Sequence, residues 1–499
     1  MPILSAAISE LSVLAQSLVG SPICQLGLFS LITWRLWRFT ISPALYPEDP
    51  REVPYWIPKR NRGKEPFAIT FAGQTLYIIS DFNDAAEISR KSISVSRDPL
   101  TQEIYKRLGI TQAVADRLFT TEPDASAPAW NSNNNNNNNN ANSRPLNPTD
   151  TMMEMYRVHL SPGPRLNAFL EADIIPRIQA ASKPDSLQQV SVVRAYYGDL
   201  LFHLHPGLIP QYMIWEKVNW KFVFGLPNFL SRDMLAAQHG LVNAFTRYFA
   251  VPAGKRGHDN FWVDAVERLL RHLEIISNED IGRLFMLQTW AILGNMFKTA
   301  FWVVSCILDD PTLVEAITEE IRPAIALGPD DVRIDHHYLS EKCPKLDSLF
   351  NEVMRLTMTS PMVRDVVSTT TIGGRQLRQG RRVLILYRQL HLDPTTWGPT
   401  PETLQPERFL QDSTLRSNIA YRPFLAKKAV FTFIACLFGQ FDVSQRAGGH
   451  IDHATGDGDK GTSSSMGKAL TRADLSKPTP GIASIADGKD VLLQLRRGG

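Results

Sequence analysis

The longest apolar stretch of the chain lies near its middle. Most residues of 284–308 are apolar, and just before this stretch Ser277 and Asp280 have the spacing of a helix capping pair. Pro311 cannot continue a helix, so the pattern predicts one helix over 277–309, roughly 50 Å long at about 1.5 Å per residue. The run is interrupted by the polar side chains of Gln288, Asn295 and Lys298. They favour burial inside a protein, with a membrane span as the alternative.

Shorter apolar segments separated by turn residues predict strands on both sides of this helix. Residues 67–71 and 75–80 flank an Ala-Gly-Gln turn and predict a hairpin. Residues 369–377 have a Gly-Gly pair at their centre, which predicts a second hairpin, and 380–386 predict a further strand. Between these regions, residues 152–272 have mixed helical patterning with many aromatic side chains. The chain is therefore expected to be mainly α-helical with small β-sheets.

The N-terminal region has a second apolar stretch. Residues 11–34 have no charge, and Arg35 and Arg38 follow closely. The length is sufficient to cross about 30 Å of hydrocarbon, and the arginines favour a cytosolic location for the rest of the chain. We therefore predict a single-pass membrane anchor within residues 1–40, with a buried amphipathic helix as the alternative. Several prolines in residues 41–64 predict a stiff hinge.

Composition and charge exclude several classes of protein. The formal net charge is +3 over 499 residues, and the basic residues are dispersed, which argues against a nucleic-acid partner. The four cysteines lack metal-ligand spacing, so a reduced compartment is favoured over a disulfide framework or a zinc site. His203 and His205 precede Pro206 and are interpreted as structural. Residues 131–142 are asparagine-rich and predict a disordered insertion, and residues 447–471 predict a flexible loop.

Two charged motifs in the second half of the chain are predicted to contact each other. Glu352 and Arg355 have i, i+3 spacing and lie on one face of a predicted helix. Further along, Arg408 lies in a Gln-Pro-Glu-Arg-Phe segment (405–409), from which a second guanidinium could reach the Glu352 carboxylate. Taken alone, a Glu-x-x-Arg pair is usually a solvated pair worth about 0.3–0.5 kcal/mol. The Gly-Gly hairpin and a His-Leu-Asp-Pro segment (391–394) between the two motifs change this interpretation.

In this order and at these separations, the motifs resemble those of the cytochrome P450 superfamily, the haem-thiolate monooxygenases. The resemblance covers roughly residues 65–499 and implies the cytochrome P450 fold, with the anchor in the endoplasmic reticulum membrane. It implies haem as the cofactor, a small apolar substrate from secondary or lipid metabolism, and NADPH-cytochrome P450 reductase as the partner of an active monooxygenase. By the same resemblance, Glu352, Arg355 and Arg408 form a structural clamp behind the haem. Arg364 would bind a haem propionate, with a surface salt bridge as the alternative.

The central helix has a more specific resemblance. Residues 290–302 are similar to those of the prostacyclin synthase and sterol 7-alpha-hydroxylase branch, which has Gly-Asn where most members have an acid-Thr pair for proton delivery. Asn295 and Thr299 are accordingly the candidates for the oxygen side of the haem. An asparagine orients a water or peroxide but transfers protons poorly, and a satisfied polar residue in a packed helix is the alternative for Asn295. The branch also contains isomerases that need no reductase, and the family's closing strand pair is expected in residues 478–497.

One expected element is absent from the sequence. Members of the family continue from a Pro-Phe pair into a glycine-rich loop that presents a cysteine, whereas Phe424 is followed directly by Leu425. A thiolate increases the electron density on the iron and favours O–O cleavage. Cys436 is the nearest cysteine, but it lies inside a predicted helix among apolar residues and is interpreted as a core residue. Two hypotheses stay open: a loop lost when the coding sequence was predicted, or a non-catalytic, haem-free relative that binds an apolar ligand or other proteins.

Overall fold

The structure of the protein is a computed structural model. It describes residues 22–37, 64–71, 74–121, 146–160, 163–174, 176–177, 187–328, 332–417, 427–445, 470, 472–474, 479, 481–486, 488–489, 491 and 493–497. Apart from residue 64, the predicted hinge lies outside the described residues. The asparagine-rich insertion, the predicted flexible loop apart from residue 470, and the junction between Phe424 and Leu425 also lie outside them.

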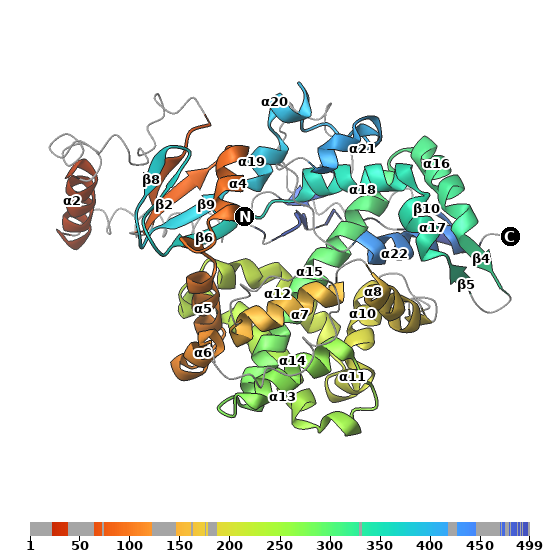
Figure 1. Ribbon diagram of the computed structural model, residues 1–499, viewed down its shortest axis with the longest axis horizontal. Helices are drawn as coiled ribbons and strands as arrows, with labels where there is room; N and C mark the ends of the chain where they lie inside the picture. The colour runs from red at the N-terminus through yellow and green to blue at the C-terminus, as the bar shows by residue number, and fades with distance from the viewer. Residues whose placement is uncertain are drawn as a thin grey trace, which may run out of the picture.

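The long helix α15 (Asn278–Leu308) crosses the middle of the molecule, with helices on both sides of it (Figure 1). Its N-terminus has the predicted capping box: the Ser277 hydroxyl accepts a hydrogen bond from Asp280 N (3.1 Å), and the Asp280 carboxylate accepts one from Ser277 N (3.2 Å). Among the described residues α15 is the one helix long and apolar enough to cross a membrane, but 67% of that stretch is buried inside the protein. The structure therefore favours the predicted core helix over a membrane span.

The other helices precede or follow α15 in the chain. Those that precede it are α2 (Pro22–Leu36), α4 (Phe82–Arg90), α5 (Asp98–Arg107), α6 (Gln112–Phe119), α7 (Pro148–Leu160), α8 (Pro164–Phe169), the π-helix η3 (Leu170–Ile174), α10 (Leu187–Tyr197), α11 (Leu200–Leu204), α12 (Leu208–Val223), α13 (Arg232–Ala250) and α14 (Phe261–His272). Those that follow it are α16 (Pro311–Ile321), α17 (His336–Glu341), α18 (Pro344–Thr357), α19 (Tyr387–His391), α20 (Pro394–Trp397), α21 (Arg408–Gln411) and α22 (Lys427–Gln440). The predicted mainly helical class is confirmed.

The strands form one five-stranded sheet and several pairs. The five-stranded sheet has the order β1 (Phe67–Phe71), β2 (Gln74–Ile79), β9 (Arg382–Ile385), β6 (Met362–Val366) and β3 (Val95–Ser96). The pairs are β4 (Ile325–Leu327) with β5 (Val332–Ile334), β7 (Thr370–Ile372) with β8 (Arg375–Leu377), β10 (Phe441–Gln445) with β13 (Leu493–Arg497), and β11 (Ala473–Asp474) with β12 (Ser484–Ile485). Both predicted hairpins, β1–β2 and β7–β8, are present.

Two long-range pairings could not be assigned from local patterns. β9 is parallel to β2, although the two strands are far apart in the sequence. The expected closing strand pair in residues 478–497 differs from the structure, because β12 and β13 do not pair with each other: β12 pairs with β11, and β13 pairs with β10. Both partners come from earlier segments, so hydrogen bonding across the fold decides the pairing and the C-terminal sequence does not.

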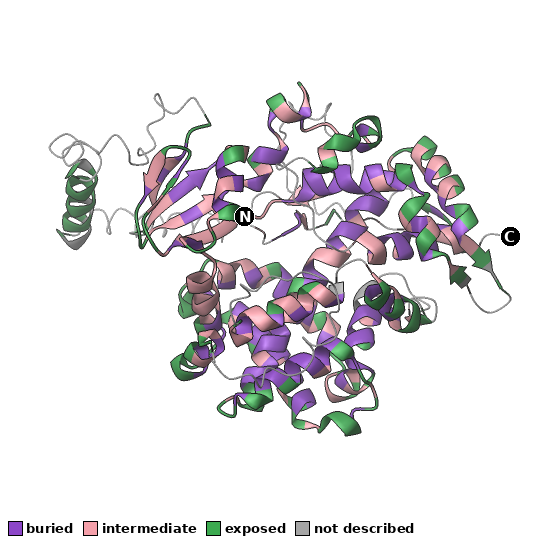
Figure 2. Ribbon diagram, viewed as in Figure 1, coloured by how far each residue is buried: buried purple, intermediate pink, exposed green. Residues whose placement is uncertain are grey.

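Two apolar clusters form the core, and α15 belongs to both of them. Figure 2 shows the buried residues on the inward sides of the helices and the sheet. Apolar residues of 281–293 pack with α7, α10 and α12–α14, whereas those of 300–307 pack with α16, α18, α22 and the large sheet. Met296 lies between these halves and packs against both clusters. α15 therefore joins the two parts of the fold at Met296.

Helix α2 is the described part of the predicted membrane anchor. It has 15 residues, fewer than the approximately 20 that a transmembrane helix needs, and residues 1–21 lie outside the described part of the chain. Large apolar side chains on it are exposed, namely Leu26, Phe29, Leu31, Ile32 and Trp34 (Figure 2). Exposed apolar side chains in a cluster are typical of a segment that binds a membrane or another protein. The single-pass anchor stays a prediction.

Asp84 lies on α4 against the Gly-Gly turn between β7 and β8. Gly373 has φ of +55°, and a Cβ there would lie 2.3 Å from Asp84 Oδ1, so the position requires glycine. The Asp84 side chain is buried, and burial together with the carboxylates of Asp81 and Glu87 raises its pKa to about 6. The folded protein therefore holds this proton more tightly than the unfolded chain does.

Asp84→Asn is expected to stabilise the protein above pH 6. The unfolded pKa of an aspartate is about 3.9, so the stability due to the protonated carboxyl is complete below about pH 4 and is lost as the pH rises through about 6. The variant should exceed the wild type by about 1–2 kcal/mol at pH 7.5 and approach it at pH 4. Denaturant unfolding at several pH values measures this, with Asp116→Asn, at an exposed position of α6, as the control. A difference that does not change with pH would contradict the assignment.

Candidate functional site

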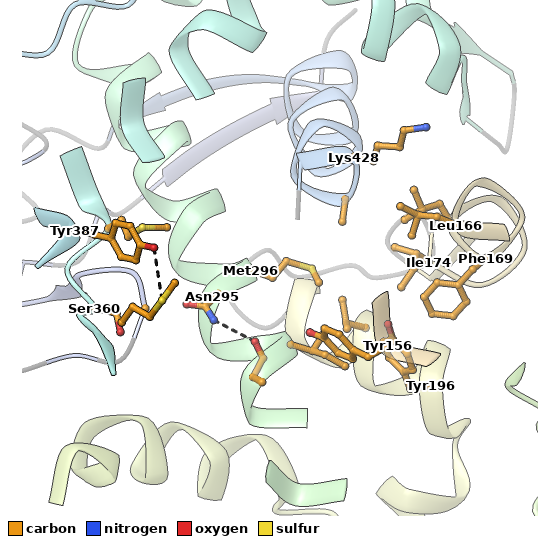
Figure 3. A pocket seen from close by; sticks show the side chains of 18 of the residues that line it. Tyr156, Leu166, Phe169, Ile174, Tyr196, Asn295, Met296, Ser360, Tyr387 and Lys428 are labelled. Carbon is orange, nitrogen blue, oxygen red and sulfur yellow. Dashed lines mark hydrogen bonds between the residues drawn. The ribbon is translucent and has the colours of Figure 1, made fainter. Parts of the chain in front are cut away.

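A cavity of ≈ 450 Å³ lies between α15, the start of α22 and the helices α7, α8 and α10 (Figure 3). This volume is within the range of pockets that bind small molecules. The described residues that line it are Tyr156, Leu166, Phe169, Leu170, Ile174, Val192, Tyr196, Ala291, Ile292, Asn295, Met296, Met358, Ser360, Pro361, Met362, Tyr387, Lys428, Ala429 and Gly481. Most of these side chains are apolar, so the cavity suits a predominantly apolar occupant.

Asn295 and Thr299 occupy different places relative to this cavity. Asn295 lines it, and both ends of its amide are hydrogen-bonded: Nδ2 donates to Ala291 O (3.2 Å), and Oδ1 accepts from Ile482 N (3.3 Å). The Thr299 hydroxyl donates to Asn295 O (2.8 Å) within the helix, and its side chain is fully buried and not part of the lining. Of the two oxygen-side candidates, only Asn295 therefore has contact with the cavity.

The C-terminal segment closes the cavity beside Asn295. Gly481 has φ of +101°, and a Cβ there would lie 2.0 Å from Asn295 Oδ1. The Gly481 carbonyl accepts hydrogen bonds from Thr359 N (3.0 Å) and Ser360 N (3.2 Å). This tight approach between α15 and the C-terminal segment therefore depends on glycine. Local sequence patterns contain no signal for this contact, because Gly481 and Asn295 are distant in the chain.

Arg364 lies on β6, next to the cavity wall. Its Nη1 donates to Val363 O (2.8 Å), and no carboxylate of the described residues forms an ion pair with it. Burial, with the nearby positive charge of Arg97, lowers the pKa of the Arg364 guanidinium. A partly buried cation without an ion-pair partner is a favourable place for an anion to bind. The position is consistent with the predicted propionate ligand, although Arg364 itself is not among the lining residues.

The structure brings the predicted clamp residues together. Glu352 and Arg355 lie on α18 with their side chains fully buried, and the guanidinium donates two hydrogen bonds to the carboxylate: Nε to Oε2 (2.9 Å) and Nη2 to Oε1 (2.8 Å). Arg408 Nε approaches both Glu352 oxygens at 3.1 Å. One buried carboxylate therefore balances two guanidinium groups, as expected from the sequence.

The two arginines of the clamp also hold the irregular chain that follows the large sheet. Arg355 Nη1 donates to the carbonyls of His391 and Pro401, both at 2.6 Å, and its guanidinium lies 5.0 Å from the ring centre of Trp397. Arg408 Nη1 donates to the Trp397 carbonyl (2.7 Å). His391 and Trp397 are the last residues of α19 and α20, and Pro401 lies in a turn. The carbonyls at a helix C-terminus have no partner within the helix, so the clamp supplies their hydrogen bonds.

Cys436 is a core residue, as the sequence indicated. It lies on α22, its thiol is buried, and burial raises its pKa to about 12, so it stays protonated. It does not line the cavity. No cysteine or histidine is among the described lining residues, and the described part of the chain has no group of three or more potential metal ligands. The described residues therefore match a porphyrin in cavity size, apolar walls and a nearby guanidinium, but they supply no ligand for its iron.

A second buried ion pair, which the sequence did not reveal, joins α12 to α15. Lys298 Nζ lies 2.9 Å from Glu216 Oε2, and both side chains are buried. The Glu216 carboxylate also accepts hydrogen bonds from Trp290 Nε1 (3.1 Å) and Tyr212 Oη (3.0 Å). A Cβ at Gly294 would lie 2.6 Å from Glu216 Oε1. The glycine of the Gly-Asn pair therefore makes room for the carboxylate of a neighbouring helix.

Lys298→Met is expected to lower the free energy of unfolding by about 2–3 kcal/mol, because it leaves the Glu216 carboxylate buried without its cation. Adding Glu216→Gln should recover part of this loss, since glutamine has no charge to balance. Urea unfolding of the wild type, the two single variants and the double variant measures the coupling energy. A coupling energy indistinguishable from zero would show that the two charges act independently.

Comparisons with known proteins identify the family. A sequence model of the family described as "Cytochrome P450" matches residues 262–426. The cytochrome P450 monooxygenase poxD of Penicillium oxalicum is 22% identical over 422 residues, which cover 78% of this chain and 83% of that protein. The chain belongs to the cytochrome P450 superfamily. The family's cofactor is haem, and its members typically receive electrons from a reductase or another redox partner.

Two further comparisons agree with this membership of the cytochrome P450 superfamily. Prostacyclin synthase of Bos taurus is 32% identical over 167 residues, which cover 31% of this chain and 32% of that protein. A zebrafish cytochrome P450 solved with abiraterone has a TM-score of 0.56 at 16% identity, covering 87% of this chain and 97% of that chain. The first similarity spans about a third of the prostacyclin synthase, and the second shows that the fold is that of a cytochrome P450.

Proposed function

We propose that this protein is a cytochrome P450 monooxygenase for a small apolar metabolite of secondary or lipid metabolism, and that its haem-ligating loop is missing from the sequence between Phe424 and Leu425. The observation that supports this proposal best is the apolar cavity against α15. The buried clamp of Glu352, Arg355 and Arg408 gives further support, because these residues match family motifs that precede the junction. Arg364, which forms no ion pair with a carboxylate of the described residues, supports it as well.

The main domain is held at a membrane, on its cytosolic side. The exposed apolar side chains of α2 support a membrane anchor, and Arg35 at its end favours a cytosolic location for the main domain. We place the protein in the endoplasmic reticulum membrane with NADPH-cytochrome P450 reductase as its partner. Asn295 would orient a polar group of the bound molecule at the cavity wall, since its amide donates and accepts but does not titrate.

A second candidate function is supported by the lack of an iron ligand among the described residues of the cavity. No thiol or imidazole lines the cavity among the described residues, and Phe424 is followed directly by Leu425. A chain made with this sequence would keep the fold and the cavity without a thiolate for haem. It would act as a haem-free binder of an apolar ligand, or as a membrane-held partner of other enzymes.

Sequencing the transcript across the codons for Phe424 and Leu425 separates the two functions. The monooxygenase requires codons for a glycine-rich loop with a cysteine at this junction. The haem-free binder requires a transcript that joins Phe424 directly to Leu425 and a purified protein without haem absorbance. A direct junction in a protein that still binds haem through a thiolate would contradict both candidates, because Cys436 is buried in the core.

A further inference from the structure

Two tyrosines from different helices lie next to each other at the cavity. Tyr156 belongs to α7 and Tyr196 to α10, and both line the cavity (Figure 3). Both rings pack edge-on against the fully buried Trp262, with ring-centre distances of 6.1 Å for Tyr156 and 5.7 Å for Tyr196. The Tyr196 ring also packs against the ring of the lining residue Phe169, with a ring-centre distance of 4.9 Å. A packed aromatic layer therefore holds both phenol rings in place.

The hydroxyl groups of these two tyrosines lack hydrogen-bond partners within the described residues, unlike those of neighbouring tyrosines. The Tyr197 hydroxyl lies 2.7 Å from Thr289 Oγ1, and the Tyr212 hydroxyl donates to Glu216 Oε1 at 3.0 Å. For Tyr156, burial alone accounts for the rise of its pKa, and for Tyr196 the causes are burial and the neighbouring phenols. Buried hydroxyl groups are normally hydrogen-bonded, so these two are available to a cavity occupant.

The tyrosine end of the cavity is uncharged. Burial raises the pKa of both phenols, so they stay neutral and can donate a proton in a hydrogen bond. His159, whose ring lies 5.8 Å from that of Tyr196, is buried and has its pKa lowered to about 4, so it is neutral as well. The charged lining residue Lys428 donates to Asn167 Oδ1 at 2.7 Å. An uncharged oxygen is therefore the group that this end of the cavity accepts best.

We propose that Tyr156 and Tyr196 form a polar subsite that binds a carbonyl or hydroxyl oxygen of an otherwise apolar ligand. This inference rests on the second candidate function, the haem-free binder, because it specifies the ligand of a cavity that haem would otherwise fill. Two phenol donors can orient a single acceptor oxygen, while the apolar walls contact the rest of the molecule. A pure hydrocarbon would leave both hydroxyl groups without partners, so the subsite favours an oxygenated ligand over a hydrocarbon of the same shape.

The test compares 2-acetylnaphthalene with 2-ethylnaphthalene, which has the same carbon skeleton with a methylene in place of the carbonyl. Their binding to the full chain is measured by calorimetry for the wild type and for the double variant Tyr156→Phe, Tyr196→Phe. The double variant should bind 2-acetylnaphthalene about tenfold more weakly, since two hydroxyl donors are lost. Its affinity for 2-ethylnaphthalene should stay within about twofold of the wild type, because that ligand accepts no hydrogen bond.

Tyr105→Phe is the matched control, because Tyr105 is a buried tyrosine that does not line the cavity. It should leave both affinities unchanged. If the double variant weakens both ligands equally, the tyrosines only pack, and the subsite is wrong while the apolar cavity stands. If the wild type binds neither naphthalene, the subsite is overturned, while the transcript across Phe424 and Leu425 still decides between the two candidate functions. If the variant weakens binding of protoporphyrin IX but of neither naphthalene, the hydroxyls serve a cofactor carboxylate and the proposal is overturned.

Discussion

Glu352→Gln is expected to lower the free energy of unfolding by about 3–5 kcal/mol. The glutamine would leave the guanidinium groups of Arg355 and Arg408 buried without the carboxylate that now lies within 2.8 to 3.1 Å of both. The NH2 group of the glutamine amide would also face one of the guanidinium groups, and the two could not form a hydrogen bond because each is only a donor. Urea unfolding followed by circular dichroism measures the loss as a shift of the midpoint at constant slope.

Glu407→Gln is the control for this measurement. Glu407 immediately precedes Arg408 but is exposed, and its carboxylate only accepts a weak hydrogen bond from Gln411 Nε2 (3.4 Å). Loss of an exposed charge changes stability by no more than about 0.5 kcal/mol. Equal losses in the two variants would mean that the clamp contributes no more than a surface residue does.

Insertion of a glycine-rich loop with one cysteine between Phe424 and Leu425 is expected to change the protein from haem-free to haem-bound. The described lining residues include no thiol, so the inserted cysteine would be the iron ligand. A loop that ends at the start of α22 places its thiolate near a helix N-terminus, which stabilises the negative charge. The absorbance spectrum of the reduced protein with carbon monoxide reports a thiolate ligand directly.

The same loop with serine in place of cysteine is the control, since its hydroxyl stays protonated and does not supply a thiolate. That protein should lack the thiolate spectrum at the same loop length. A thiolate spectrum in the serine variant would assign the ligand to another cysteine. Absence of the spectrum in both variants would show that the cavity no longer accepts haem, and would favour the haem-free binder.

Several elements of the fold were predictable because their causes are local. The capping box of Ser277 and Asp280 needs only residues three apart, and its geometry matches the prediction. The Gly373-Gly374 turn has positive φ at both residues, which glycine adopts without steric strain. The buried positions of Glu352 and Arg355 followed from their spacing together with a family resemblance, since the pair alone would have been interpreted as a surface pair.

Other contacts depend on which helices come together. Glu320 lies on α16, and its carboxylate accepts hydrogen bonds from Lys345 N (2.8 Å) and Leu346 N (2.9 Å) at the start of α18. The partner of Lys298 proved to be Glu216 on α12. In both cases the sequence shows the charged residue but not its partner, because the partner lies on another helix.

The sequence by itself determined the long apolar helix, the hairpins, the clamp motifs and the absence of a cysteine loop after Phe424, because each depends on residues that are adjacent or on a motif in order. Only the tertiary structure decided that the Thr299 hydroxyl donates to a carbonyl of its own helix and does not reach the cavity. It also decided that Asn295 contacts Gly481 and that Tyr156 and Tyr196 line one cavity. These contacts join segments distant in the chain. Such pairs form because their shapes and hydrogen-bonding groups fit together in the folded protein, and local sequence patterns do not show which distant segments will fit.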